Sequence, residues 1–328
     1  MSKLKLLTMS EIPTEKVQWL WYPYLPKGKI TIVQGDPGEG KTTFVLALSA
    51  LLTHGLPMPG CTEGTPPMNI IYQTAEDGLA DTVKPRLTTL GADCSRVLVI
   101  DESERELTLS DRRLAQAIQE TNAGLLVLDP IQAYLGDGVD MHRANEVRPI
   151  FKRLGQLAEQ TSCAILLVGH MNKMQGVKSA YRGLGSIDFR AAARSVLLVG
   201  RSKDDPDVRV VVHDKSSLAP EGASVLFSLN SEQGFSWNGF CDTTASDLLS
   251  GSGPSITKTE QAEHLLLELL QNGEVASEEL LRQASALGIS ERTLKIAKQN
   301  RGVISVRRGD RWYARLPDTC QEGKGVMC

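Results

Sequence analysis

Short apolar runs alternate with helical stretches over most of the chain. The predicted strands cover residues 29–34, 69–73, 97–101, 125–129 and 164–168. Helical patterns separate most of these runs, for example over 41–53, which is rich in Leu and Ala, and over 148–160. Nearly continuous apolar strands bounded by helices are typical of a mostly parallel sheet that is buried on both faces. The pattern therefore predicts an α/β fold.

The pattern changes after residue 199. Residues 208–213, 224–230 and 234–238 look like strands joined by turns, which predicts an antiparallel extension of the sheet. Residues 241–257 are rich in Ser, Thr, Gly and Asp, as linkers are. The remainder shows three helical patterns and then a two-stranded wing over 303–315.

These boundaries divide the chain into two domains with flanking segments. The aromatic group in the first segment (Trp19, Trp21, Tyr22 and Tyr24) is expected to pack on the large domain after it, with a base-stacking platform as the alternative. The predicted parts are a lead-in segment over 1–28, a large domain over 29–240, a linker over 241–257, a small domain over 258–316 and a tail over 317–328.

Composition narrows the class of protein. With 328 residues, 41% hydrophobic and 23% charged, the chain has the composition of a globular protein. It has no long apolar run and no stretch suited to a signal peptide, so we expect a soluble, cytoplasmic protein without a membrane partner. Its six cysteines form no CxxC pair and are expected to be free thiols. A net charge of −3 argues against coating of a polyanion, unless the average hides a basic patch.

A phosphate-binding loop lies directly after the first predicted strand. Residues 35–42 match GxxxxGK[ST] and open a predicted helix, which is the context that this motif requires. Its glycines let backbone N–H groups close around phosphate oxygens, Lys41 reaches the β- and γ-phosphates, and Thr42 holds Mg²⁺. We therefore expect ATP and Mg²⁺ as cofactors. The residues expected to bind the nucleotide are Gly35, Asp36, Pro37, Gly38, Glu39, Gly40, Lys41, Thr42 and Thr43.

Two further carboxylates should complete this site. An Asp at the end of a neighbouring strand must hold Mg²⁺ with Thr42, and both Asp101 and Asp129 end apolar runs. We favour Asp129, because a helix and another strand come after it and place its end beside the loop. For the base that orients the attacking water we favour Glu76, with its neighbour Asp77 as the alternative.

Six segments in this order resemble the RecA-like hexameric ATPases, most closely the RepA-type replicative helicases of plasmids and phages. They are GDPGEGKTT, IYQTAED, LLVLDP, AILLVGHMNK, YRGLGSIDFRAAARSVLLV and VVHDKSSLAPEG, and the resemblance covers about residues 30–230. It implies a RecA-like P-loop NTPase domain with a mostly parallel central sheet and a homo-oligomer, expected to be a hexamer.

The resemblance also implies individual roles. Lys41 and Thr42 would serve phosphate and Mg²⁺, Glu76 would be the base, Asp129 would coordinate the metal, and His170 would sense the γ-phosphate. Arg194 would be an arginine finger acting on a neighbouring subunit, with Arg190 as the alternative. Lys215 would also act in trans, although Ser217 stands where related helicases often carry an arginine.

Two regions are candidates for DNA. The glycine-containing stretch 171–185 carries Lys173, Lys178 and Arg182, and could contact single-stranded DNA in a ring channel. Residues 277–300 have the pattern of a helix-turn-helix, so the small domain is expected to be a winged helix that binds duplex DNA, or else a protein partner. Its candidate phosphate contacts are Lys295, Lys298, Arg307, Arg308 and Arg311.

Together these features predict an ATP-hydrolysing ring motor acting on DNA, a replicative helicase of a plasmid, phage or other mobile element. The alternative is a nucleotide-switched DNA-binding or helicase-loading ATPase that does not unwind. A small-molecule kinase is disfavoured, because the sequence shows no acceptor-binding lid.

Overall fold

The computed structural model forms two compact units, residues 1–251 and 252–328. The described residues are 6–136, 138–141, 143–171, 187–202, 205–230, 234–249, 262, 265–266, 269–270, 273–286, 290–309 and 311–316.

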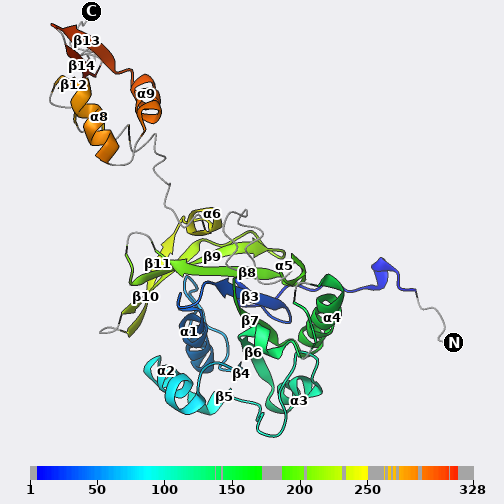
Figure 1. The fold of residues 1–328 in the computed structure, drawn as a ribbon. Coiled ribbons are helices and arrows are strands. Elements are labelled where there is room, and N and C mark those ends of the chain that lie inside the picture. Colours follow the sequence, from blue (N-terminus) through cyan, green and yellow to red (C-terminus); the bar gives the residue numbers. More distant parts are fainter. Residues whose placement is uncertain are drawn as a thin grey trace, which may run out of the picture. The chain divides into compact units, whose positions relative to one another are not determined.

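The first unit is built around a nine-stranded sheet (Figure 1). Its strands are arranged in the order β11-β10-β9-β8-β3-β7-β6-β4-β5. The strands from β8 to β5 are parallel, and β9, β10 and β11 extend the sheet antiparallel beyond β8, as the sequence predicted. The bounds are β3 Ile30–Gly35, β4 Asn69–Thr74, β5 Val97–Leu98, β6 Ala123–Asp129, β7 Ala164–His170, β8 Ser195–Arg201, β9 Val208–Ser216, β10 Ser224–Asn230 and β11 Gly234–Cys241.

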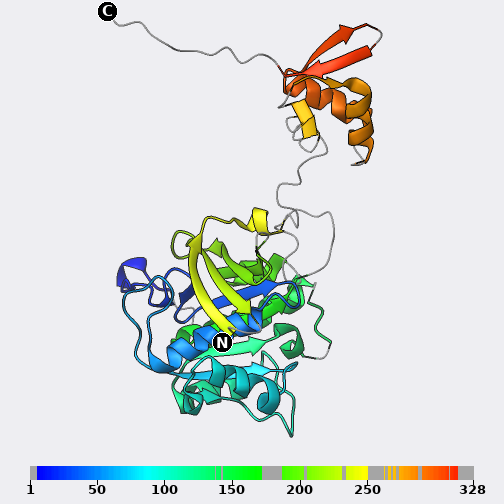
Figure 2. The ribbon, with the colours of Figure 1, turned by 90° about the vertical axis from the view of Figure 1, so that its left-hand side faces the viewer.

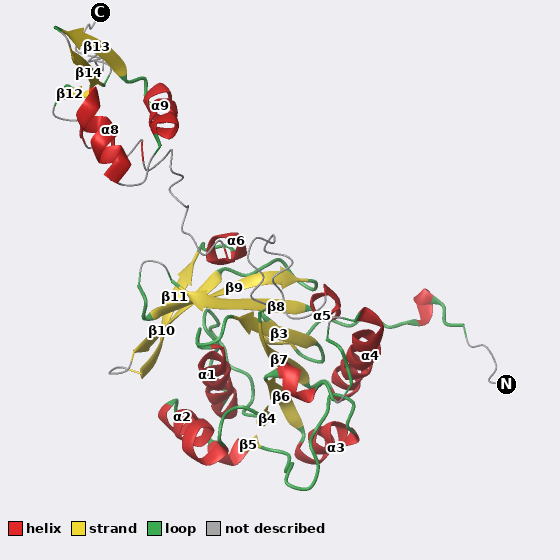
Figure 3. Cartoon of the chain, in the orientation of Figure 1, coloured by secondary structure: helices red, strands yellow, loops and turns green. Residues whose placement is uncertain are grey.

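Helices cover both faces of this sheet (Figure 3). α1 (Lys41–His54) and α2 (Lys84–Thr89) pack on one face, and α3 (Arg112–Thr121) and α4 (Ala144–Thr161) pack on the other. In β6, Leu125 and Val127 belong to the first core and Leu126 and Leu128 to the second. Because both faces are buried, the strand has no polar alternation.

The shorter elements complete the unit. α4 begins at residue 144, four residues before the predicted start, where Glu146 in its first turn accepts a hydrogen bond from the backbone of Asp140. The other helices among the residues that the structure describes in this unit are α5 (Ile187–Ala192), α6 (Ala245–Leu249), the 3-10 turns η1 (Met9–Glu11), η3 (Cys94–Arg96) and η4 (Ile131–Tyr134), and the π-helical turn η2 (Leu79–Val83).

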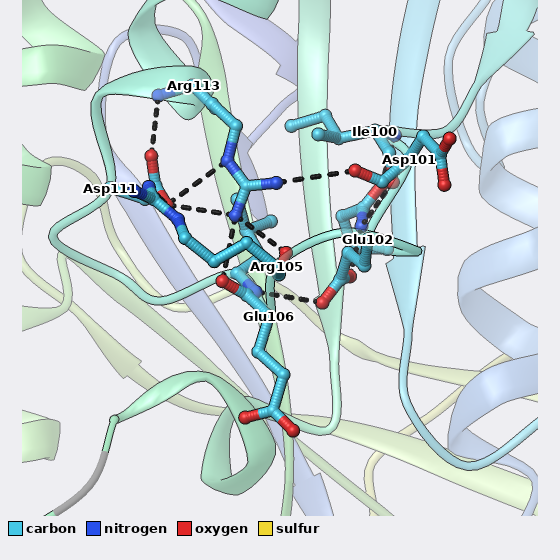
Figure 4. Close-up of polar contacts among 9 residues, drawn as sticks. Ile100, Asp101, Glu102, Arg105, Glu106, Asp111 and Arg113 are labelled. Carbon is cyan, nitrogen blue, oxygen red and sulfur yellow. Dashed lines mark hydrogen bonds and ion pairs between the residues drawn. The ribbon is translucent and has the colours of Figure 1, made fainter.

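The strand predicted over 97–101 is wrong beyond Leu98. At the edge of the sheet, the side chain of Gln73 replaces the backbone ladder: its Oε1 accepts from the amide of Ile100 at 2.6 Å and its Nε2 donates to the carbonyl of Ile100 at 3.3 Å. Arg113 then fixes the next loop, donating to the carbonyls of Asp101 and Glu106 (Figure 4). The chain therefore turns away from the sheet before Asp101.

Two of the four aromatic residues of the lead-in segment are part of the core, whereas Tyr22 is exposed. The segment forms two short strands, β1 (Trp19–Trp21) and β2 (Leu25–Pro26). Trp21 is 1% exposed and donates to the carbonyl of Pro59, and Tyr24 is 3% exposed and donates to the carbonyl of Ala223. For these two rings packing is confirmed over a stacking platform. Residues 6–17 before them are all exposed, and include Leu6, Leu7, Met9, Ile12 and Val17.

The linker was predicted to begin at residue 241, and this is wrong for 241–249. Cys241 ends β11, and α6 packs its apolar side chains on a cluster formed by Met171, Leu198, Val210 and Val212. Burial of Leu248 and Leu249 against this cluster holds the segment on the first unit. Residues 250–257 of the predicted linker lie outside the described residues.

In the second unit, α8 (Ser277–Ala286) and α9 (Glu291–Asn300) lie beside a three-stranded sheet (Figure 2), and the described residues 262, 265–266 and 269–270 are also helical. Ser290 caps α9 by accepting a hydrogen bond from the amide of Thr293. The strands are β12 (Val275–Ala276), β13 (Ile304–Arg308) and β14 (Arg311–Arg315), in the order β12-β14-β13. Leu266, Leu280, Leu294 and Ala297 form its core.

Two negative observations concern the described residues. None of their helices combines the length and hydropathy that a membrane crossing requires. The four cysteines in this part, Cys61, Cys94, Cys163 and Cys241, are free thiols, as expected.

The neutral, buried His213 predicts acid sensitivity. Its Nδ1 accepts from the amide of Gly222, its Nε2 lies 3.1 Å from Ser195 Oγ, and burial lowers its pKa from 6.5 to about 4. The unfolded chain therefore binds more protons between these pH values, so the free energy of unfolding falls as the pH falls. Between pH 7 and pH 5 this group should remove about 2 kcal/mol.

Chemical denaturation at the two pH values tests this. The variant His213→Gln should lose correspondingly less stability on acidification, whereas His54→Gln, at a histidine outside the core, should behave like the wild type. Equal pH dependence of His213→Gln and the wild type would contradict the assignment.

Candidate nucleotide site

The loop between β3 and α1 has the backbone of a phosphate cradle. Gly38 and Gly40 adopt φ of 79° and 88°, which side chains disfavour, and Gly40 caps α1. A Cβ on Gly35 would lie 2.1 Å from the carbonyl oxygen of Val199 in β8. The loop is therefore fixed by direct contact with the neighbouring strand.

Lys41 and Thr42 lie in the first turn of α1, and Thr42 contacts Asp129, the carboxylate predicted to share Mg²⁺ with it. Lys41 is 4% exposed, and its Nζ donates to the carbonyl of Asp36 at 2.8 Å. Burial lowers the pKa of Lys41, and the negative charge of Asp129 opposes this shift. Thr42 Oγ1 donates to Asp129 Oδ2 at 2.8 Å. Burial raises the pKa of Asp129, and the hydrogen bonds from Thr42 and Tyr72 oppose that rise.

The register of the parallel strands brings these groups together. Gly35 at the end of β3 pairs with His170 at the end of β7, and Thr74 of β4 pairs with Asp129 at the end of β6. β7 lies between β3 and β6, so Asp129 and His170 end neighbouring strands at the edge that carries the loop. Asp101 instead accepts from the amide of Ser103 in an exposed loop beyond the edge strand.

The acidic pair after β4 is divided between two partners. Glu76 Oε2 lies 3.4 Å from His170 Nε2, and its side chain is 60% exposed. Asp77 is instead paired with Arg86 of α2 at 3.0 Å. Of the two carboxylates, Glu76 is therefore the one directed to the ends of the central strands.

The three residues predicted to act on a neighbouring subunit differ in the ion pairs and hydrogen bonds that their side chains form. Arg190 is paired with Asp214 and also donates to its carbonyl. The ammonium of Lys215 donates to the carbonyls of Arg190 at 2.6 Å and Ala193 at 2.8 Å, so it caps α5 of its own chain. Arg194 is exposed, and no described residue forms an ion pair with its side chain. The action of Lys215 on a neighbouring subunit stays a prediction.

The candidate DNA contacts are only partly described. Lys173, Lys178 and Arg182 lie outside the described residues. In the second unit, Lys295 and Arg307 are exposed, while burial lowers the pKa of Lys298. Arg308 pairs with Glu274, and Arg311 is placed by its backbone in β14 only.

Sequence reasoning missed two residues of the site. Tyr72 donates its hydroxyl to Asp129 Oδ2 at 2.9 Å, and Gln132 donates to the carbonyl of His170 at 3.3 Å. Tyr72 lies inside an apolar strand, so its pattern indicates only burial. A polar tip two residues before the strand's end was the available signal.

These features define an α/β domain with a P-loop nucleotide site. Residues 3–176, more than half of the chain, match the AAA domain family, and the chain belongs to that family.

Curated relatives carry one recurring name. The DNA repair protein RadA of Halalkalibacterium halodurans is 28% identical over 152 residues, which cover 46% of this chain and 29% of that protein. RadA of Bacillus subtilis is 28% identical over 149 residues, 45% of this chain and 29% of that protein. The match thus spans less than a third of the length of these relatives.

Two solved structures are also similar. The KaiC-like protein PH0186 from Pyrococcus horikoshii OT3 has a TM-score of 0.48 at 14% identity, over 69% of this chain and 100% of that chain. The RadB recombinase has a TM-score of 0.45 at 18% identity, over 65% of this chain and 91% of that chain.

The site fits a nucleotide with Mg²⁺. Among the described residues no group of His, Cys, Asp and Glu could enclose a metal ion alone. Mg²⁺ is commonly held by one carboxylate, water and substrate phosphates, and the Thr42 and Asp129 oxygens meet that need.

The contact of Gly35 with β8 predicts that alanine destabilises the protein more at Gly35 than at Gly38. Gly35→Ala forces apart two backbones and should lower the free energy of unfolding by about 2–3 kcal/mol, with loss of nucleotide binding. At Gly38 an added Cβ meets nothing within 4 Å, so only backbone strain of about 1–2 kcal/mol applies. Denaturation and nucleotide titration compare the two, and a Gly35→Ala protein as stable as Gly38→Ala would exclude the close packing.

Proposed function

We propose that this chain is an ATP-hydrolysing ring motor acting on DNA, a replicative helicase of a plasmid, phage or other mobile element. One observation carries the proposal: the nucleotide site is assembled within one chain, while Arg194 is exposed and has no acidic partner among the described residues. An ATPase that lacks its own finger is suited to completion by a second copy.

The residues at the strand ends and in the first turn of α1 have different roles in the proposed hydrolysis. Lys41 binds the β- and γ-phosphates, and Thr42 and Asp129 would hold Mg²⁺, which neutralises phosphate charge when bound. Glu76 orients the attacking water, and His170, 3.4 Å from Glu76, senses the γ-phosphate. The exposure of Glu76 leaves it accessible to that water.

Arg194 is proposed as the finger rather than Arg190. Arg190 would have to break its pair with Asp214, whereas Arg194 needs no such exchange. The backbone of Arg194 is fixed by hydrogen bonds to Ile30 and Ser217, so an exposed guanidinium projects from a rigid base. Lys215 supports this segment by capping α5.

Assembly into a ring, which we propose to be a hexamer, has support from the N-terminal segment. Within residues 6–17 five large apolar side chains are exposed, and exposed apolar side chains gathered in one segment favour a protein partner. A second copy is the partner that the incomplete site also requires.

DNA is proposed as the nucleic acid that the motor binds and moves along. The name of the RadA relatives supports a DNA-directed role, and the proposed contacts are Lys173, Lys178 and Arg182 for single strands. The second unit, proposed to be a winged helix, offers exposed Lys295 and Arg307 to phosphates.

Mixed variants test the ring mechanism. Arg194→Ala should reduce ATP hydrolysis about a thousandfold or more while nucleotide binding persists, because a finger acts on the transition state. Lys41→Ala should abolish hydrolysis, yet mixing the two inactive proteins should restore part of it, since each supplies what the other lacks. Arg112→Ala, at an exposed arginine of α3, is the control and should stay active.

Normal hydrolysis by Arg194→Ala would exclude Arg194 as the finger, and hydrolysis that responds to neither DNA nor protein concentration would exclude the motor.

The exposed basic residues of the second unit favour a second candidate, a nucleotide-switched DNA-binding or helicase-loading ATPase. DNA binding and hydrolysis without strand displacement would select this candidate.

The second unit's role has its own test. The double variant Lys295→Ala, Arg307→Ala should weaken duplex DNA binding and reduce the slope of log affinity against log salt by about 2, one for each lost phosphate contact. Arg282→Ala, at an arginine already paired with Glu279, should leave both unchanged. Unaltered DNA binding by the double variant would favour protein docking instead.

A further inference from the structure

Tyr72 is a fully buried tyrosine whose polar tip reaches the nucleotide site. It is 0% exposed, and its ring lies in the same apolar core as Phe44 of α1 and Val83 and Leu87 near α2. Its hydroxyl donates to Asp129 Oδ2 at 2.9 Å.

The Asp129 carboxylate thus receives two hydroxyl donors on one oxygen. Thr42 Oγ1 reaches the same Oδ2 from α1 at 2.8 Å, while Tyr72 comes from β4. Two donors from different elements fix both the position of Oδ2 and the rotation of the carboxylate plane. Because the plane is fixed, the direction of Oδ1 is fixed as well, although neither hydroxyl donates to it.

The two donors are not equivalent. Thr42 is proposed to be a metal ligand itself, so its hydroxyl would also coordinate Mg²⁺ when the ion binds. Tyr72 is enclosed by core residues and can serve only the carboxylate. It is therefore the donor whose contact with Asp129 does not depend on the nucleotide.

We propose that Tyr72 is a positioning residue for Mg²⁺, and that its hydroxyl orients Asp129 so that Oδ1 meets the water shell of the nucleotide-bound ion. This inference rests on the proposed function of Thr42 and Asp129 as the Mg²⁺ site. Outer partners of metal ligands typically contribute about ten- to a hundredfold in metal affinity.

The chain offers a matched control. Tyr134 is also buried, at 1% exposed, and among the described residues its hydroxyl has no hydrogen-bond partner. Tyr72→Phe and Tyr134→Phe therefore remove the same atom from two buried rings, but only the first removes a donor to Asp129.

Mn²⁺ serves as the probe, with its binding to the ADP-loaded full chain followed by electron paramagnetic resonance. Tyr72→Phe should weaken Mn²⁺ binding about tenfold or more, leave ADP affinity in the absence of metal unchanged, and raise the Mg²⁺ concentration needed for half-maximal hydrolysis. Tyr134→Phe should match the wild type in all three. In an Asp129→Asn background, Tyr72→Phe should weaken Mn²⁺ binding no further.

Several results would overturn the inference. They are wild-type Mn²⁺ affinity in Tyr72→Phe, an equal loss in Tyr134→Phe, or a full further loss in the Asp129→Asn background, which would show a general effect on the fold. Failure of the wild-type protein to bind Mn²⁺ with ADP would instead remove the proposed function itself.

Discussion

The hydrogen bond from Thr42 to Asp129 depends on nearly every larger feature of the first unit. Thr42 is placed by the loop that Gly35 seats against β8, and Asp129 by a strand that is two positions away in the sheet. A 2.8 Å contact between them requires the parallel register through β7 to be correct at every strand. The cores on both faces stabilise that register, so packing and chemistry are linked through one contact.

Electrostatics near this contact depend on the same burial. Lys41 and Asp129 are both nearly inaccessible to water, and burial shifts the pKa of each toward its neutral form while the opposite charge resists the shift. Such a pair tolerates the low dielectric because each group also has hydrogen-bond partners. Glu76 and Arg194, which are exposed, are the charged residues proposed to meet water and a second copy.

Local pattern was sufficient for the parts of the fold whose cause is local. The P-loop, the buried strands and the choice of Asp129 over Asp101 could be predicted from neighbouring residues and from strand order. The predicted bounds are wrong where contacts with residues distant in the sequence determine the structure. The side chain of Gln73 shortens β5, and packing on an apolar cluster holds α6, which was predicted to be linker, on the first unit. Likewise the capping of α5 by Lys215 joins residues more than twenty positions apart, which spacing does not reveal.

We propose that one chain holds a nucleotide site that a second copy completes. The mass of the particle formed with Mg²⁺ and a slowly hydrolysed ATP analogue tests it most directly. We expect a closed assembly of six identical copies that dissociates when the nucleotide is removed or when Lys41 is replaced by alanine. A protein that binds the nucleotide with Mg²⁺ and remains a monomer at every concentration would contradict it.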